Sequence, residues 1–145
     1  MMLWTAADPA PNPRRVRLFA KAKGIDLPAT EIAMMQGAHK APDHLARNPR
    51  AQLPYLELDA GRVLAETTAI CRYLDELHPE PPLFGTTPFE RAETDMWTRR
   101  VEMGLMVPVG QAWVHGHAIT ARLFTQVPEV AELGRRNATA FMCWP

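Results

Sequence analysis

Two dipeptides in the middle of the chain, Leu53-Pro54 and Glu66-Thr67, carry its clearest chemistry. A proline at the start of a strand tolerates a cis peptide bond, because the cis form of an X-Pro bond costs only about 0.5–1 kcal/mol. A cis bond would turn the backbone N–H and C=O groups of Leu53 outward, where an extended peptide could pair with them as a neighbouring strand does. Leu53-Pro54 is therefore a candidate peptide-binding edge.

Glu66 and Thr67 lie where a helix is expected to begin. Free backbone N–H groups and the helix dipole favour an anion at such a position, and the Thr67 hydroxyl adds a donor. The Glu66 carboxylate offers an acceptor for a cationic amine. Together with Leu53-Pro54, this pair predicts a site for a small extended peptide with a carboxylate and an ammonium group. A structural reading stays open, with Pro54 as the first residue of a strand and Thr67 as a helix cap.

The elements that must position these residues form a mixed α/β pattern. Four strands are expected, at residues 2–7, 27–34, 55–58 and 62–64. Pro28 keeps the second strand at a sheet edge, and the turn ending in Gly61 joins the last two strands as a hairpin. One helix is expected to start at the cap Asn12 and stop at Gly24, and another runs through residues 66–77. Asp43 is a candidate cap for one short helical turn between the second and third strands.

The second half of the sequence is helical. Residues 79–88 contain four prolines and predict an extended linker. The run from Thr87 to Glu90 predicts a capping box that opens a long helix to about Val107, where Pro108 breaks or kinks the pattern. A last helix opens at Pro128, with one face formed by Val130, Leu133, Asn137 and Phe141. The expected organisation is a domain at residues 1–78, a linker at 79–88 and a partial helical domain at 89–145.

The composition excludes several classes of function. The chain has 16 basic and 16 acidic residues, so no net charge draws it to nucleic acid or to an acidic membrane surface. It shows neither a signal peptide nor an apolar stretch of the roughly 18 residues that a membrane span requires. We therefore expect a cytoplasmic protein without nucleic-acid or membrane partners. Cys71 and Cys143 lack metal-ligand spacing, which indicates reduced thiols and no metal, and Cys71 is most simply a core residue.

Residues 39–76, HKAPDHLARNPRAQLPYLELDAGRVLAETTAICRYLDE, strongly resemble the N-terminal, thioredoxin-like domain of cytosolic glutathione transferases. The family's H-K, N-P, Q-V-P and E-S motifs are matched, with Leu53 in place of Val and Thr67 in place of Ser. The resemblance extends through residues 10–26 and into the helical half, closest to the phi-like and atypical bacterial or fungal branches. It implies an α/β thioredoxin-like domain followed by an all-helical domain, here partial because the resemblance suggests a C-terminal truncation.

The resemblance also implies a co-substrate, glutathione, and a role for each matched residue. The glycine carboxylate would be held by His39 and Lys40, the cysteinyl backbone by Gln52 and Leu53 next to Pro54, and the γ-glutamyl end by Glu66 and Thr67. For His39 and Lys40 the plainer reading is a solvated basic pair in a loop. The implied reaction is transfer of glutathione to a small apolar electrophile by a cytoplasmic, dimeric enzyme of detoxification.

The residue that should activate the glutathione thiol is missing. The family usually places a Tyr, Ser or Cys near the first helix, whereas this chain has Ala10 at the matching position and no serine at all. What remains is the N-terminus of that helix, whose dipole can stabilise a thiolate, helped by the Asn12 amide or the Thr5 hydroxyl. An atypical branch that resembles this sequence is thought to position a water with a histidine, which points to His115. Asn12 as a simple cap and His115 as a structural residue are the alternatives.

Two functional hypotheses follow from these residues. In the first, the chain is an atypical glutathione transferase with an electrophile cleft lined by Trp113 and His115. In the second, it is a non-catalytic relative that serves as a binding or interaction module, an alternative that Ala10 favours. A homodimer is expected in either case, because a shortened helical half would leave apolar residues uncovered.

Overall fold

A four-stranded mixed sheet organises the first half of the chain in the computed structural model, which describes residues 1–7 and 10–143. The chain divides into two units, Met1–Leu83 and Phe84–Pro145, here called the N-terminal unit and the C-terminal unit. The strand order is β2 (Ala29–Glu31), β1 (Met2–Thr5), β3 (Tyr55–Glu57) and β4 (Val63–Ala65). β1 is parallel to β2 and antiparallel to β3, which pairs antiparallel with β4. β2 lies at a sheet edge, so that prediction is confirmed.

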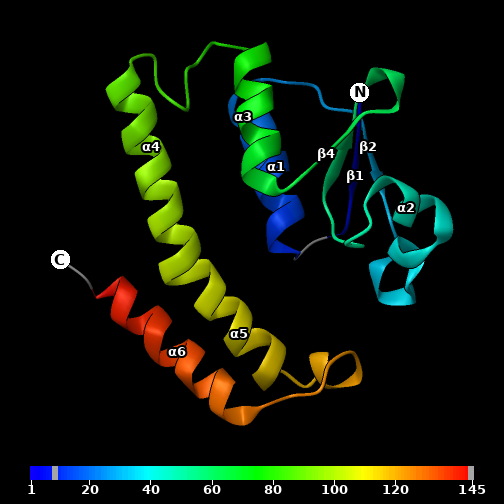
Figure 1. The fold of residues 1–145 in the computed structure, drawn as a ribbon, viewed down its shortest axis with the longest axis vertical. Helices are drawn as coiled ribbons and strands as arrows, with labels where there is room; N and C mark the ends of the chain where they lie inside the picture. Colours follow the sequence, from blue (N-terminus) through cyan, green and yellow to red (C-terminus); the bar gives the residue numbers. More distant parts are fainter. Residues whose placement is uncertain (8–9, 144–145) are drawn as a thin grey trace. The chain divides into compact units, whose positions relative to one another are not determined.

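Two helices cover one side of this sheet. Figure 1 shows α1 (Pro11–Ala22) and α3 (Thr67–Leu77) together on one side of the strands and α2 (Pro42–Arg47) on the other. The core between the sheet and α1 and α3 contains five side chains with no exposed surface: Leu3, Val16, Leu56, Ile70 and Leu74. Alternation along the strands points Leu3 and Leu56 into this core. The N-terminal unit is thus the expected thioredoxin-like α/β domain.

Two expected helix caps are wrong. The first helix begins at Pro11 with Ala10 at the N-cap, so Asn12 lies inside the first turn. Prolines suit the first turn because the N–H groups there need no intrahelical partner, and the helix therefore extends back to Pro11. For the same reason α2 begins at Pro42 after Ala41, and Asp43 lies within its first turn without capping it.

A buried ion pair connects α1, α3 and the chain that follows α3. The ammonium group of Lys23, with a fully buried side chain, lies 2.5 Å from Oδ1 of Asp75 and also donates to the carbonyl oxygen of Pro81. The same carboxylate oxygen accepts from the backbone N–H of Leu83 at 3.2 Å. Residues 79–83, expected to be a linker, are therefore bound to the helical layer of the N-terminal unit.

All regular secondary structure in the described residues of the C-terminal unit is helical. α4 (Pro88–Val101) starts with the predicted capping box, in which the Thr87 hydroxyl accepts from the Glu90 N–H and the Glu90 carboxylate accepts from the Thr87 N–H. A π-helical turn, Glu102–Met106, then leads into α5 (Val107–Gly116). Pro108 has no N–H to donate to the carbonyl groups of the preceding π-helical turn, and the wide turn accommodates this interruption without ending the helical run.

The last helix, α6 (Pro128–Met142), packs against α5 through small residues. Its buried positions are Ala131, Gly134 and Ala138, whereas Leu133, from the predicted apolar face of this helix, is 51% exposed. A Cβ on Gly134 would lie 2.5 Å from the carbonyl oxygen of Pro108. The helix therefore turns its smallest residues inward, because the backbone of α5 comes too close for larger ones.

Candidate functional site

The loop before β3 has an unusual backbone held by a buried side chain. The Leu53–Pro54 peptide bond is cis, in agreement with the expectation from Pro54, and Ala51 has a φ of 52°. Asn48, only 5% exposed, donates from its side-chain amide to the carbonyl oxygen of Gln52 at 2.8 Å. Asn48 was not among the site residues expected from the sequence, although its N-P pair belongs to the family pattern.

The backbone of Leu53 is available for pairing. Within residues 1–7 and 10–143 no hydrogen bond to its N–H or C=O group is found. Gln52 beside it is exposed, and Pro54 is buried. An extended peptide can therefore add to this segment as a short strand, with the Gln52 side chain free to reach it.

Glu66 and Thr67 lie next to this loop at the same end of the sheet. Because Tyr55 pairs with Ala65 at the ends of two antiparallel strands, Pro54 and Glu66 lie next to this pair, just beyond the strands. Glu66 has φ 68° and ψ 122°, a conformation that residues with a Cβ rarely adopt, and its side chain is exposed. Backbone strain of this kind is concentrated at ligand-binding positions.

Glu66 is also the N-cap residue of α3. Its carbonyl accepts from the Ile70 N–H, while its side chain gives no cap hydrogen bond. The carboxylate is therefore left to interact with a ligand. Thr67, 8% exposed, is the first residue of the helix, at the end that favours an anion.

His39 and Lys40 form a 3-10 turn, Ala38–Lys40, directly before α2. Burial lowers the pKa of His39, the nearby Lys40 and His44 lower it further, and a hydrogen bond with the Met34 backbone opposes the shift. His39 is therefore neutral at pH 7, and its buried Nδ1 has no hydrogen-bond partner among the described residues. The exposed Lys40 carries the positive charge of the pair.

The N-terminus of α1 offers a single donor. Ala10 occupies the N-cap without a side-chain cap hydrogen bond, and the first turn contains no acidic residue. Pro11 and Pro13 have no N–H group, so the exposed Asn12 supplies the one free backbone donor of this turn. An anion at this end of α1 would meet that N–H group and the positive end of the helix dipole.

The proposed help from Thr5 is not available. Thr5 is 1% exposed, and its hydroxyl oxygen accepts from Nη1 of Arg17 at 2.9 Å. The same Arg17 nitrogen donates to the carbonyl oxygen of Ala6 at 2.9 Å. Thr5 therefore binds α1 to the end of β1, and the prediction that its hydroxyl assists a thiolate is wrong.

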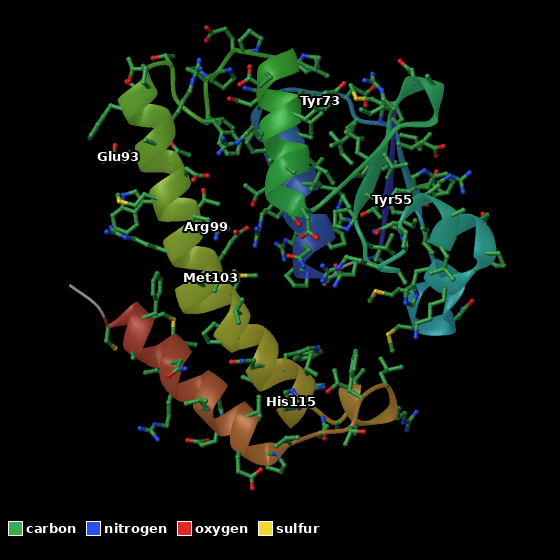
Figure 2. The ribbon with its side chains drawn as sticks, viewed as in Figure 1. Tyr55, Tyr73, Glu93, Arg99, Met103 and His115 are labelled. Carbon is green, nitrogen blue, oxygen red and sulfur yellow. The ribbon has the colours of Figure 1, made fainter. Side chains whose placement is uncertain are left out.

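Neither tyrosine takes the place of the missing activating group. Tyr55 lies on β3 and Tyr73 on α3 (Figure 2). Burial raises the pKa of Tyr55, and its hydroxyl lies 2.6 Å from Nδ1 of His44. Burial also raises the pKa of Cys71 to about 11, so this thiol is a protonated core group, whereas Cys143 is exposed. The expectation that Cys71 belongs to the core is confirmed.

His115 and His117 belong to the C-terminal unit and are both held through Nδ1. Nδ1 of His115 accepts from the N–H of Val127, the N-cap residue of α6, at 3.2 Å. Nδ1 of His117 accepts from the Ile119 N–H at 3.2 Å, and its ring stacks on Trp113 with 3.9 Å between centroids. In the neutral ring the proton must then sit on Nε2, so each histidine can donate to a water or an anion but has no lone pair left to act as a base.

A polar network surrounds these histidines. The Thr120 hydroxyl, in a residue 3% exposed, lies 2.7 Å from the carbonyl oxygen of His117. The Gln126 side-chain amide donates to the same carbonyl at 2.8 Å and to the Val114 carbonyl at 3.2 Å. These contacts fix the turn after α5, and the sequence analysis did not identify them.

Among the residues that the structure describes, no helix is both long enough and apolar enough to cross a membrane. No group of three or more His, Cys, Asp or Glu side chains in the same residues is arranged to hold a metal ion.

Comparison with known proteins gives one consistent family. A family model for the glutathione S-transferase N-terminal domain matches residues 10–77. Glutathione S-transferase 2 of Saccharomyces cerevisiae is 38% identical over 107 residues, which cover 72% of this chain and 46% of that protein. Maleylacetoacetate isomerase of Pseudomonas aeruginosa is 36% identical over 80 residues, 54% of this chain and 38% of that protein. The chain thus spans less than half the length of these two relatives.

A solved structure extends the similarity to nearly the whole chain. The crystal structure of a glutathione S-transferase domain-containing protein from Marinobacter aquaeolei VT8 superimposes with a TM-score of 0.91 at 34% sequence identity. The alignment covers 98% of this chain and 71% of that protein.

Proposed function

The chain belongs to the glutathione S-transferase family, and we propose that its N-terminal unit binds glutathione in an extended conformation. The observation that carries this proposal is the pairing of Tyr55 with Ala65, which brings Leu53-Pro54 beside Glu66-Thr67 at one end of the sheet. A tripeptide fits these two motifs, because its backbone can pair with Leu53 and its α-amino acid end can bind Glu66 and Thr67.

Each part of glutathione has its partner in this proposal. The γ-glutamyl carboxylate binds at the N-terminus of α3 with Thr67, and the γ-glutamyl ammonium binds the exposed carboxylate of Glu66. The cysteinyl backbone pairs with Leu53, next to Gln52. The glycine carboxylate is held by the charge of Lys40 and by a hydrogen bond from the neutral ring of His39. The proposed glutathione-binding domain spans residues 1–78, with a linker at 79–88 and the helical domain at 89–145.

We propose that the enzyme activates the glutathione thiol without a side-chain hydroxyl. The free thiol has a pKa of about 8.5, so activation requires a group that favours the thiolate. With Ala10 at the N-cap, the candidates are the backbone N–H of Asn12 and the dipole of α1. His115, with its proton on Nε2, would support a bound water or the anion as a donor and would not remove the proton. The thiolate then attacks a small apolar electrophile, forming a carbon–sulfur bond.

A second candidate function rests on Ala10. Its methyl group cannot donate to a thiolate, and this favours a non-catalytic relative that holds glutathione or a protein partner. Family membership also supports three further proposals, namely a cytoplasmic location, a homodimeric state and a role in detoxification.

The test is a titration of the purified protein with glutathione, following the ultraviolet absorbance of the thiolate across pH. We expect a bound thiol with a pKa below that of free glutathione, a further decrease in Ala10→Ser, and little change in Asn12→Ala, which keeps the backbone N–H. Binding without ionisation would favour the non-catalytic candidate. A folded protein that binds no glutathione would overturn the proposed site.

A further inference from the structure

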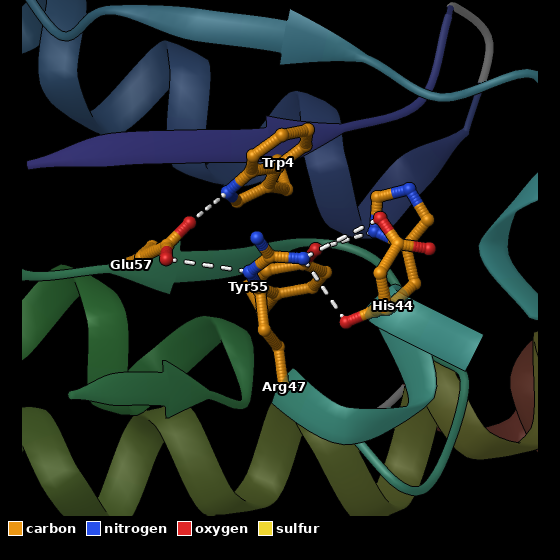
Figure 3. Close-up of polar contacts among 6 residues, drawn as sticks. Trp4, His44, Arg47, Tyr55 and Glu57 are labelled. Carbon is orange, nitrogen blue, oxygen red and sulfur yellow. Dashed lines mark hydrogen bonds and ion pairs between the residues drawn. The ribbon is translucent and has the colours of Figure 1, made fainter. Parts of the chain in front are cut away.

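Five side chains form a polar and aromatic cluster between the sheet and α2, here called the α2 clamp (Figure 3). It contains Trp4 of β1, Tyr55 and Glu57 of β3, and His44 and Arg47 of α2. Trp4 and Tyr55 are cross-strand partners, and Tyr55 and Glu57 alternate onto the same face of the sheet. This face is opposite to the one that α1 and α3 cover.

The clamp uses both oxygens of one carboxylate. The indole nitrogen of Trp4 donates to Oε2 of Glu57 at 2.8 Å, and Nε of Arg47 donates to Oε1 at 3.3 Å. The hydrogen bond from Trp4 is the main cause of a lowered pKa of Glu57, so this carboxylate stays charged at neutral pH. The guanidinium of Arg47 also lies 5.4 Å from the centre of the Trp4 ring. One residue of α2 is thereby held to β3 by charge and to β1 by its contact with an aromatic face.

A second contact holds the preceding turn of α2. The Tyr55 hydroxyl lies 2.6 Å from Nδ1 of His44, and the His44 ring meets the Trp4 ring edge to face at 5.3 Å between centroids. Tyr55 is 1% exposed, so its hydroxyl has few other partners to choose from. His44 and Arg47 lie three residues apart and therefore project from the same side of the helix toward the sheet.

Helix α2 depends on these contacts. It has six residues, none of them buried, and no side-chain cap hydrogen bond at its N-terminus. A helix of this length does not persist on its own propensity. It begins at Pro42, two residues after Lys40, so its position fixes the turn that carries His39 and Lys40.

We propose that the α2 clamp sets the affinity of the glutathione site for the glycine end of the tripeptide, with Tyr55 and Arg47 as positioning residues. This inference rests on the proposed function, because it assumes that His39 and Lys40 receive the glycine carboxylate. Loosening the clamp lets the 3-10 turn of His39 and Lys40 move, while Glu66 and Thr67 stay at the start of α3, outside the clamp. Leu53 precedes β3, whose backbone pairing with β1 and β4 does not depend on the clamp side chains.

The test compares two ligands, glutathione and γ-glutamylcysteine, which lacks the glycine. Tyr55→Phe removes one oxygen from the clamp, and Arg47→Met removes the charged contacts. We expect each variant to weaken glutathione binding about fivefold, the typical net effect of one hydrogen bond, and to leave γ-glutamylcysteine binding unchanged. Calorimetric titration measures both dissociation constants, and Arg47→Met keeps the test valid if Tyr55→Phe fails to fold.

Matched controls exist in the chain. Tyr73→Phe removes the other tyrosine hydroxyl, on α3, and Arg135→Met removes an exposed arginine that pairs with Glu132 on α6. Both should bind the two ligands as the unmodified protein does. Equal losses for both ligands in the clamp variants, or no loss for either, would overturn the inference. A wild-type protein that binds neither ligand would instead overturn the proposed function and this inference with it, a result distinguishable because it appears without any substitution.

Discussion

The two units of the chain maintain their folds in different ways. In the N-terminal unit, polar side chains are brought inside and paired, as with the buried Lys23 and Asp75 and the clamp carboxylate of Glu57. In the C-terminal unit, α5 and α6 approach until glycine is the residue that fits, as at Gly134 against the backbone of Pro108, and polar contacts fix the turn after α5. The polar pairs of the N-terminal unit fix the directions of donors and acceptors, whereas the close approach of α5 and α6 fixes the distance between two helices.

This difference matches the chemistry that each unit is proposed to perform. Recognition of a charged tripeptide needs defined positions for backbone and side-chain donors, and a network of hydrogen bonds supplies them. A surface for apolar electrophiles needs shape more than direction. Large apolar side chains are exposed in the C-terminal unit, among them Phe89 at 74% and Met103 at 62%.

The largest expected effect comes from breaking the buried ion pair between Lys23 and Asp75 in the N-terminal unit. Lys23→Met leaves the Asp75 carboxylate without its ammonium partner in a buried site, and we expect a loss of about 3–5 kcal/mol in the free energy of unfolding. Urea denaturation followed by circular dichroism measures it. Lys21→Met, an exposed change on the same helix, should stay within about 0.5 kcal/mol of the wild type.

A paired change sharpens this prediction. Replacing both Lys23 and Asp75 by apolar residues removes the unpaired charge and should recover most of the lost stability. If Lys23→Met were as stable as Lys21→Met, the ion pair would not be what holds α1, α3 and residues 79–83 together.

The close contact between α5 and α6 can be broken at Gly134. Gly134→Ala places a methyl group 2.5 Å from the Pro108 carbonyl oxygen, and we expect a loss of about 1–3 kcal/mol as α5 and α6 move apart. Gly110→Ala is the matched control, since a Cβ there meets nothing within 4 Å and alanine favours the helix by up to about 1 kcal/mol. Thermal unfolding of the two variants should shift in opposite directions. Equal shifts would mean that helix propensity, and not the approach of α6 to α5, decides the outcome.

The smallest effect concerns the start of α4. Thr87→Ala removes one half of the capping box and should cost about 1 kcal/mol, measured by urea denaturation, whereas Thr125→Ala in an exposed loop should be neutral. Hydrogen bonds from the Thr86 side chain and from the Thr86 and Thr87 N–H groups lower the pKa of Glu90 to about 2.

The lowered pKa of Glu90 predicts in which direction stability changes with pH. Its contribution to stability is fully present above the ordinary carboxyl pKa of 4.5 and is lost as the pH falls toward 2. A carboxyl titration of Glu90 by NMR should show this low value in the wild type and a higher one in Thr86→Ala, which removes the hydroxyl that contributes most to the shift. An unchanged value in that variant would place the cause of the shift elsewhere.

The sequence predicted those features that depend on local chemistry. The four strands, the capping box at Thr87 and the stop at Gly24 each follow from residue types within one turn or one strand. The neighbouring motifs Leu53-Pro54 and Glu66-Thr67 were found for the same reason, because each has a short-range signature.

Features that depend on contacts between distant segments were missed. The α2 clamp joins Trp4 to Glu57 and Tyr55 to His44. The periodicity of a sequence does not predict which polar side chains of distant segments make contact. The buried small residues of α6 were missed, because the approach of α5 to Gly134 cannot be read from the hydrophobicity of one helix. The start of α1 was predicted too late, with Asn12 as the cap, because a second proline, Pro11, extends the helix toward the N-terminus.

The contrast between the two cysteines has a practical consequence for labelling. Cys71, 4% exposed and with a raised pKa of about 11, reacts slowly with a maleimide at neutral pH, whereas Cys143 at the end of α6 is exposed. A dye added without mutagenesis therefore attaches near one end of the C-terminal unit and leaves the N-terminal core intact. Its emission would report when a second chain covers that end of the helix.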